Sequence, residues 1–311
     1  MTNRDRSLAV LVAICWGLNF IAIHASLEQY PPMFCVALRF GLLAIPTILL
    51  VPRPDVRLRW LIGYGVGFGI AQFVFLYAGM RAGMPPGLAS LVLQASAPFT
   101  VVLAGVLLRE RLSGRQVLGI VVAIVGLAGV AWHRSQTAAL LPVVLTLLGA
   151  LGWAFGNLAN RQARPSNPLH LTLWMSVVPP LPMLAVALIV EGPDRIGESL
   201  ATSFTVEALP AVLGIAYTVV IGTVLGSGLW TILMTRYPSS TVAPFSMLVP
   251  VVGMSASALL LHERLDPVEL VFGGVVIAGV LLGSTQSRRR LTPPPPDAYG
   301  ADVPTGALAK G

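Results

Sequence analysis

Leu107-Leu-Arg-Glu-Arg-Leu112 has a near copy later in the chain, Leu260-Leu-His-Glu-Arg-Leu265. Glu263 follows Glu110 by 153 positions (263 minus 110), about half of the 311-residue chain. Duplication on this scale indicates a chain that is built from two copies of one structural unit. We therefore expect two homologous halves, and the remaining question is what kind of unit is repeated.

The composition excludes a soluble domain. The chain is 55% hydrophobic and 11% charged, with a mean hydropathy of +0.80, whereas soluble domains carry about 25% charged residues. A helix that crosses a bilayer needs about 20 mainly apolar residues, and such segments recur along the whole sequence. Because lipid offers no partner for backbone N–H and C=O groups, segments of this length predict transmembrane α-helices.

The apolar segments predict ten spans, five in each half. We expect them at Ser7–Leu27, Pro32–Val51, Trp60–Met80, Gly87–Leu108, Val117–Trp132, Leu140–Ala159, Leu169–Val190, Leu209–Met234, Ser239–Leu261 and Val268–Leu282. An odd number of spans in each copy forces the second copy to enter the membrane upside down. The predicted fold is therefore an all-α membrane protein of ten transmembrane helices, arranged as two inverted five-helix repeats.

The positions of the charges predict orientation and boundaries. Most of the 20 Lys and Arg residues fall in loops that lie on one side when the N-terminus is inside, so we expect both termini to be cytoplasmic. The first repeat is predicted over residues 1–133, the second over 138–286, and a disordered cytoplasmic tail over 287–311. The net charge of +7 therefore reports topology and membrane contact, and we expect no nucleic acid partner. An acidic loop after the seventh span is interpreted as a solvated face; it carries Glu191, Asp194, Glu198 and Glu207.

Polar residues inside the spans are the candidates for a binding site, because they are costly in lipid unless they line a cavity or find partners. Arg39 stands seven residues into its span; it can bind a substrate carboxylate, or it can anchor the bundle by snorkelling to the interface. Asn19, Gln72 and Gln94 can donate and accept hydrogen bonds to a zwitterion, or they can link helices to one another.

Three tryptophans and one further amide complete the candidate set. Trp16, Trp153 and Trp174 can wall a cavity or stack on an ammonium group; Trp174, near a span end, equally fits an interfacial anchor. Asn157 lies one helical turn after Trp153, which puts both on one face. We therefore assign substrate binding to Trp16, Asn19, Arg39, Gln72, Gln94, Trp153, Asn157 and Trp174.

Motifs of catalysis are missing from the sequence. There is no His-Glu-x-x-His, no Walker phosphate loop and no Gly-x-Ser-x-Gly. We expect no enzyme activity, no catalytic residues, no cofactor and no metal. The sequence leaves the oligomeric state open.

Several stretches resemble the EamA-type carriers of the drug/metabolite transporter superfamily. They are Trp16-Gly-Leu-Asn-Phe20, Leu38-Arg-Phe40, Ala71-Gln-Phe73, Gly83–Gln94, Val242-Ala-Pro244, Leu248–Gly253 and the two Glu-Arg-Leu elements. The resemblance spans both halves. It implies ten spans, a central cavity and the bacterial inner membrane as the location, and it implies export of small amino-acid metabolites such as O-acetylserine or cysteine.

Three hypotheses follow for function. The first is a secondary transporter that exports such metabolites by alternating access between the repeats; it fits Arg39, the amides and the indoles, which suit a zwitterion. The second is a carrier of another neutral metabolite, for example a nucleoside or a sugar. The third is a membrane receptor or scaffold without transport activity, in which Arg39 is only an anchor. All three share the lipid membrane, and the transporter hypotheses add a small-molecule substrate.

Overall fold

A computed structural model describes residues 1–137, 139–237, 239–264 and 266–284, and these residues fold only into helices and connecting turns. The expected tail at 287–311 lies outside the described residues. The helices of the first half are α1 (Asn3–Gln29), α2 (Pro32–Leu50), α3 (Leu58–Tyr64), η1 (Gly65–Ala71), α4 (Gln72–Arg81), α5 (Pro86–Val92), η2 (Leu93–Ala95), α6 (Ser96–Leu107) and α7 (Gly114–Thr137). Those of the second half are α8 (Leu141–Ala163), α9 (Pro168–Trp174), η3 (Met175–Val177), α10 (Pro180–Val190), α11 (Pro193–Ala201), α12 (Leu209–Ala216), η4 (Tyr217–Ser227), α13 (Gly228–Arg236), α14 (Ser239–Val242), η5 (Ala243–Met247), α15 (Leu248–Leu260) and α16 (Pro267–Ser284).

Several of these helices join end to end into long apolar stretches. In the described part of the chain, nine stretches are long and apolar enough to cross a membrane, and a shorter apolar helix follows at Pro267–Gly283. The composite stretches contain changes of helix type: η1 and η4 are π-helices, while η2, η3 and η5 are 3₁₀ segments. The sequence predicted the stretches themselves but not these irregular turns within them.

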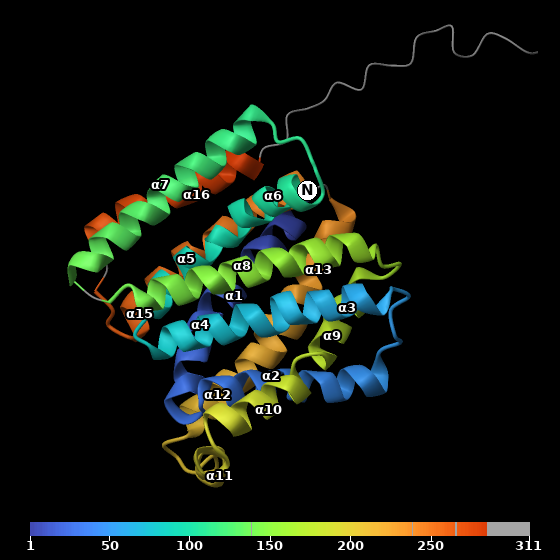
Figure 1. The fold of residues 1–311 in the computed structure, drawn as a ribbon, viewed down its shortest axis with the longest axis vertical. Coiled ribbons are helices and arrows are strands. Elements are labelled where there is room, and N and C mark those ends of the chain that lie inside the picture. The colour runs from blue at the N-terminus through green and yellow to red at the C-terminus, as the bar shows by residue number, and fades with distance from the viewer. Residues whose placement is uncertain (138, 238, 265, 285–311) are drawn as a thin grey trace, which may run out of the picture.

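The two halves interleave within one bundle (Figure 1). Helix α1 packs against η4, α12 and α15 of the second half, while α8 packs against α3, η1, α4 and α6 of the first half. Helix α2 packs against α10. Helices α7 and α16 lie side by side at one edge of the molecule (Figure 1), in the most extensive helix contact of the structure. Residues near position 20 can therefore share a site with residues near position 220.

The repeated motif adopts the same backbone conformation in both halves. Arg109 has φ 54° and His262 has φ 53°, and these positions are 153 apart (262 minus 109). In each copy the following glutamate donates its backbone N–H to a carbonyl six residues earlier, at 3.4 Å for Glu110 and 3.3 Å for Glu263. A left-handed residue directly after the last helical turn, with a hydrogen bond back across it, ends many helices. The repeat in sequence is thus a repeat in local structure.

The two motif glutamates lie at opposite ends of one helical stretch. Glu263 Oε2 accepts the backbone N–H of Gly87 at 3.3 Å, next to the start of the stretch Pro86–Leu107, and Glu110 follows the end of that stretch. Its 22 residues correspond to about 33 Å of helix at the standard rise of 1.5 Å per residue. We call the end that contains Glu263 and the turn between α1 and α2 the α1–α2 end.

Small residues allow the central helices to approach closely. A Cβ atom at Gly67 of η1 would lie 2.5 Å from the backbone nitrogen of Gly156 in α8. Backbones in such contact gain packing that larger side chains would prevent. The glycine-rich part of the third stretch therefore joins the first half of the chain to the second.

The acidic loop is not wholly a solvated face, so this expectation was wrong for Glu191. Its carboxylate accepts the backbone N–H groups of Met33 at 2.7 Å and of Phe34 at 2.9 Å. These two N–H groups belong to the first turn of α2, where no helical carbonyl is available to them. Glu191 therefore caps α2 and ties it to α10, because it directly follows that helix. The other three acidic residues of the loop, Asp194, Glu198 and Glu207, are exposed.

Candidate functional site

Arg39 is buried between helices of both halves. It is 4% exposed, and its guanidinium donates to the Tyr77 hydroxyl of α4 at 3.2 Å and to Thr223 Oγ1 of η4 at 3.0 Å. Among the described residues no carboxylate forms an ion pair with it. A guanidinium at a span centre costs roughly 2.5–3.5 kcal/mol on insertion scales, and neutral hydroxyls do not neutralise its charge. The site therefore carries a net positive charge that is available to an anionic group.

Aromatic rings surround the Arg39 guanidinium. Its central carbon lies 3.9 Å from the centre of the Phe73 ring and 5.1 Å from that of Phe40, within the range of cation–π attraction. Phe73 in turn stands edge-on to Phe68 at 5.8 Å, and Phe68 stands edge-on to Trp153 at 5.9 Å. Trp153 is therefore linked to the Arg39 site through two rings rather than by direct contact.

Helix η4 brings two more candidates to the same place. Trp16 Nε1 donates to the carbonyl of Gly222 at 3.0 Å, and a Cβ atom on Gly222 would lie 2.7 Å from Asn19 Oδ1. Gly222 directly precedes Thr223, which binds Arg39. Only a residue without a side chain leaves room for Asn19 here. Trp16, Asn19 and Arg39 therefore meet at one short segment of η4.

Several buried polar atoms on the helices of this site have no hydrogen-bond partner. In the described part of the chain they are Asn19 Oδ1, Arg39 Nε, Gln72 Oε1 and Thr218 Oγ1. Thr218 belongs to η4, and its carbonyl accepts the Thr223 hydroxyl at 2.9 Å. Gln72 directly precedes Phe73 and is 3% exposed. A buried polar group without a partner costs about 1–3 kcal/mol, so such atoms on the helices around Arg39 indicate a place for a polar ligand or ordered water.

The remaining candidates have partners elsewhere. Gln94 Nε2 donates to the Ser246 carbonyl at 3.2 Å, and Asn157 Nδ2 donates to Thr100 Oγ1 at 3.2 Å. Trp174 Nε1 donates to the Val51 carbonyl at 2.9 Å, just beyond the end of α2. Each of these contacts links two helical stretches, which is the structural role that the sequence left open. None of them places the residue against Arg39.

Sequence reasoning missed Tyr77 and Thr223 as partners of Arg39. The role of Thr223 was not predicted because threonine is common in membrane helices, where its hydroxyl usually bonds a carbonyl of the preceding turn. Tyr77 was not singled out because it is one of several aromatic residues in the same stretch. A search for polar groups on the helix faces opposite Arg39 would have needed the packing of α2 against α4 and η4, which the sequence alone does not give.

The described residues contain no group of three or more His, Cys, Asp or Glu side chains placed to hold an ion. The two cysteines, Cys15 and Cys35, are buried and unpaired. The residues around Arg39 are hydroxyl, amide, guanidinium and aromatic groups. Such a set can orient a small polar ligand by hydrogen bonds, ion pairing and stacking.

A bundle of long apolar helices around a buried, positively charged polar site defines a multi-pass membrane protein of the carrier type. Comparison with known families agrees: residues 6–132 and 140–285 each match the EamA-like transporter family. The chain belongs to this family of membrane transporters, and the two matched segments correspond to its two halves.

Relatives support the assignment along almost the whole chain. A Salmonella typhimurium protein named "Probable amino-acid metabolite efflux pump" is 40% identical over 298 residues, which cover 94% of this chain and 98% of that protein. An Escherichia coli protein of the same name is 39% identical over 289 residues, covering 91% and 95%. A Streptantibioticus cattleyicolor protein named "Probable terminal-alkyne amino-acid exporter" is 26% identical over 296 residues, covering 90% and 94%.

A solved crystal structure shares the fold. It superposes with a TM-score of 0.61 at 17% sequence identity, and the match covers 94% of this chain and all of that one. At this level of identity the likeness concerns the arrangement of helices alone. The chain is thus a transporter by family, and the solved structure agrees with its fold.

Proposed function

We propose that the protein is a secondary transporter that exports small amino-acid metabolites, of the O-acetylserine or cysteine kind, across the bacterial inner membrane. It has ten transmembrane helices in two inverted five-helix repeats, residues 1–133 and 138–286. Both termini and the tail at 287–311 are cytoplasmic. The α1–α2 end of the bundle accordingly faces outward.

The observation that carries this proposal is the unneutralised charge of Arg39. A ligand carboxylate supplies the counter-ion that the described residues do not provide, and Arg39 Nε is a donor still without a partner. Charge-assisted hydrogen bonds of this kind are about twice as strong as neutral ones. Asn19 and Gln72, each with a free amide oxygen, accept hydrogen bonds from the ligand's ammonium group.

Two observations support the inverted arrangement and alternating access. Glu110 and Glu263 occupy equivalent positions in the two halves but opposite ends of one helical stretch. The packing of the halves is also exchanged: α1 meets η4 and α15, as α8 meets η1 and α6. Two nearly equivalent halves around one site can swap conformations, which exposes the site to each side in turn.

The choice of cargo is supported by the relatives. Two of them, at 40% and 39% identity, are named as amino-acid metabolite efflux pumps, and a third is named as an exporter of terminal-alkyne amino acids. An amino-acid backbone common to all these cargos presents a carboxylate and an ammonium group. These are the two groups that Arg39 and the free amide oxygens can bind.

Flux through proteoliposomes tests the proposal. Purified protein is reconstituted, and efflux of labelled O-acetyl-L-serine and L-cysteine is measured with and without competing amino acids, nucleosides and sugars. We expect saturable flux that amino acids inhibit and that nucleosides and sugars do not. Inhibition by a nucleoside or sugar instead would favour the neutral-metabolite hypothesis. The absence of saturable flux for every solute would favour a receptor or scaffold.

A further inference from the structure

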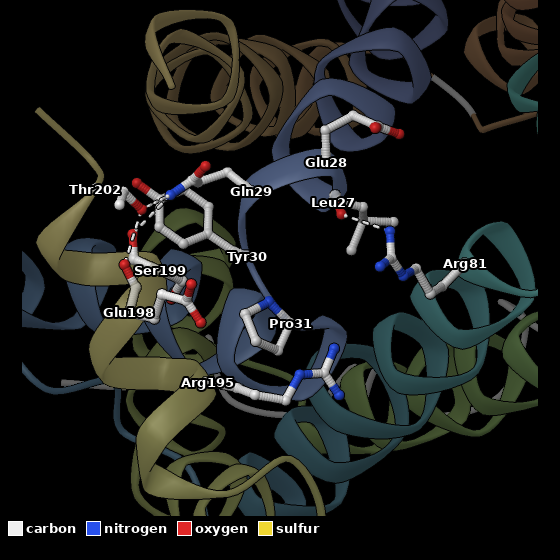
Figure 2. Close-up of a pocket in the computed structure, with 10 residues that line it drawn as sticks. All are labelled: Leu27, Glu28, Gln29, Tyr30, Pro31, Arg81, Arg195, Glu198, Ser199 and Thr202. Atoms are coloured by element: carbon white, nitrogen blue, oxygen red, sulfur yellow. Dashed lines mark hydrogen bonds between the residues drawn. The ribbon is translucent and has the colours of Figure 1, made fainter. Parts of the chain in front are cut away.

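A hollow lies at the α1–α2 end, outside the Arg39 site. It has a volume of about 220 Å³, and its walls come from the turn between α1 and α2, from the last residue of α4 and from α11. Figure 2 draws its ten lining residues. A space of this size holds several water molecules or one small amino acid, and no predicted site residue belongs to it.

Two arginines reach into this hollow from different walls. Arg81 comes from α4 and Arg195 from α11 (Figure 2). Arg81 uses one guanidinium nitrogen to bond the Leu27 carbonyl at 3.3 Å, at the end of α1. Arg195 is exposed and has no hydrogen bond or ion pair with the described residues. The donors of Arg195 are therefore free for a ligand.

Acidic and hydroxyl groups line the same hollow. Glu28 of α1 and Glu198 of α11 are both among the lining residues, and Glu198 stands three positions after Arg195 on the same helix. Thr202 contributes a hydroxyl that Gln29 Nε2 already bonds at 2.6 Å. Two guanidinium and two carboxylate groups around one small space match a molecule with both charges, rather than a simple anion or cation.

The position of the hollow relates it to the Arg39 site. Phe73, Tyr77 and Arg81 follow one another at intervals of four residues on α4, so they lie along one face of that helix. Phe73 stacks on Arg39 and Tyr77 bonds it, whereas Arg81 lines the hollow. The hollow is therefore about one turn beyond Tyr77, at the α1–α2 end of the same helix face.

We propose that this hollow is a second, weaker site for small zwitterions. Arg81 and Arg195 hold the carboxylate, and Glu28 and Glu198 hold the ammonium group. The inference rests on the proposed function in that the ligand is the same cargo, which occupies the hollow after it leaves Arg39. Binding is weak because exposed charges interact through water. Weak binding is suited to a site from which the cargo is released.

Equilibrium binding of labelled O-acetyl-L-serine to the purified full-length chain in lipid nanodiscs tests this proposal. We expect two components in the wild type, and Arg195→Gln lowers the affinity of the weaker one by at least about threefold. The tighter component is unchanged in Arg195→Gln and is lost in Arg39→Gln. Arg195 is a better position for this substitution than Arg81, because the Arg81 side chain also bonds the end of α1. Arg195→Lys retains most of the weak binding.

The matched control is Arg264→Gln, which removes the same charge from the α1–α2 end at an exposed residue outside the hollow. It leaves both components unchanged. A single component in the wild type that Arg39→Gln abolishes, or an Arg195→Gln curve identical to the wild-type curve, overturns the second site while the proposed function stands. A single wild-type component that Arg195→Gln weakens and Arg39→Gln leaves unchanged would instead refute the Arg39 site and leave the hollow as a site of its own. A wild type that binds no probe at all overturns both.

Discussion

At the scale of single residues, Arg39 is the most informative side chain of the bundle. It is buried, charged and held by two hydroxyls and two aromatic rings from three helical stretches. These contacts fix the guanidinium in place without neutralising it. A purely structural arginine would be expected to satisfy all its donors or to snorkel to the interface, and Arg39 does neither, since Nε has no partner.

Replacing this side chain should separate transport from folding. We expect Arg39→Gln to lower kcat/KM for amino-acid flux by about tenfold or more, because a charged hydrogen bond to the cargo is lost. Membrane insertion, measured by the yield of folded protein, stays near the wild-type level. Thr223→Val, which removes only one partner of Arg39, gives a smaller loss. Equal losses of flux and of folded protein in Arg39→Gln would instead assign Arg39 to anchoring.

Gly222 offers a second test at the same scale. A methyl group there would lie 2.7 Å from Asn19 Oδ1, so Gly222→Ala must displace the Asn19 amide. We expect KM to rise by roughly fivefold or more, from the strain of overpacking, with little change in protein yield. The control is Gly274→Ala, because a methyl group at Gly274 would meet nothing within 4 Å. Similar KM values for Gly222→Ala and Gly274→Ala would show that Asn19 does not contribute to the binding site.

At the scale of elements, the apolar stretches could be predicted from the sequence because lipid imposes a minimum length on a spanning helix. The duplicated motif could be recognised because its two copies keep a constant offset. The left-handed residue at Arg109 and His262 was not readable, since glycine is the usual residue there. The π-helices η1 and η4 were also hidden: nothing in the apolar pattern distinguishes them from α-helix.

The candidate site was partly readable for the same reason. Burial of polar residues in lipid singled out Trp16, Asn19 and Arg39, which do meet at η4. It could not separate them from Gln94 and Trp174, whose partners are carbonyls of neighbouring stretches. Spacing along one helix says which face a residue occupies, but only the packing of helices says what that face meets.

One end of the contact between α7 and α16 contains the charged side chain of Asp266. His133 Nε2 lies 2.8 Å from Asp266 Oδ2, while Asp266 Oδ1 accepts the Val268 N–H at 2.8 Å and so caps α16. The hydrogen bond with His133, followed by that with Val268, holds the pKa of Asp266 below its usual value of 3.8. Asp266 precedes the apolar helix and lies outside the spans.

This geometry predicts how stability depends on pH. Because the folded-state pKa of Asp266 is lowered, its stabilising effect is complete above the ordinary aspartate pKa and is lost as the pH falls through the folded-state value. We expect the melting temperature of the wild type to fall more steeply on acidification than that of Asp266→Asn, which is less stable at neutral pH. Parallel curves for the two proteins would show that the Asp266 contacts contribute nothing.

At the scale of the whole molecule, the two ends of the bundle differ. At the start of α1, the Tyr237 hydroxyl donates to Asp5 Oδ2 at 2.6 Å, and Arg236 lies 3.7 Å from the same carboxylate. These contacts tie α1 to the end of α13. The α1–α2 end instead contains the hollow of about 220 Å³. A difference between the two ends is what one state of the proposed alternating-access cycle requires.

The central claim is that one polar site is reached from each side of the membrane in turn. It is tested most directly by replacing Cys15 and Cys35 with alanine, introducing a single cysteine as Asn19→Cys, and labelling it with a membrane-impermeant thiol reagent from either face. We predict that this cysteine reacts from both faces, and that O-acetyl-L-serine raises the rate from one face while lowering it from the other. Reaction from one face only, at a rate that the solute does not change, would contradict it.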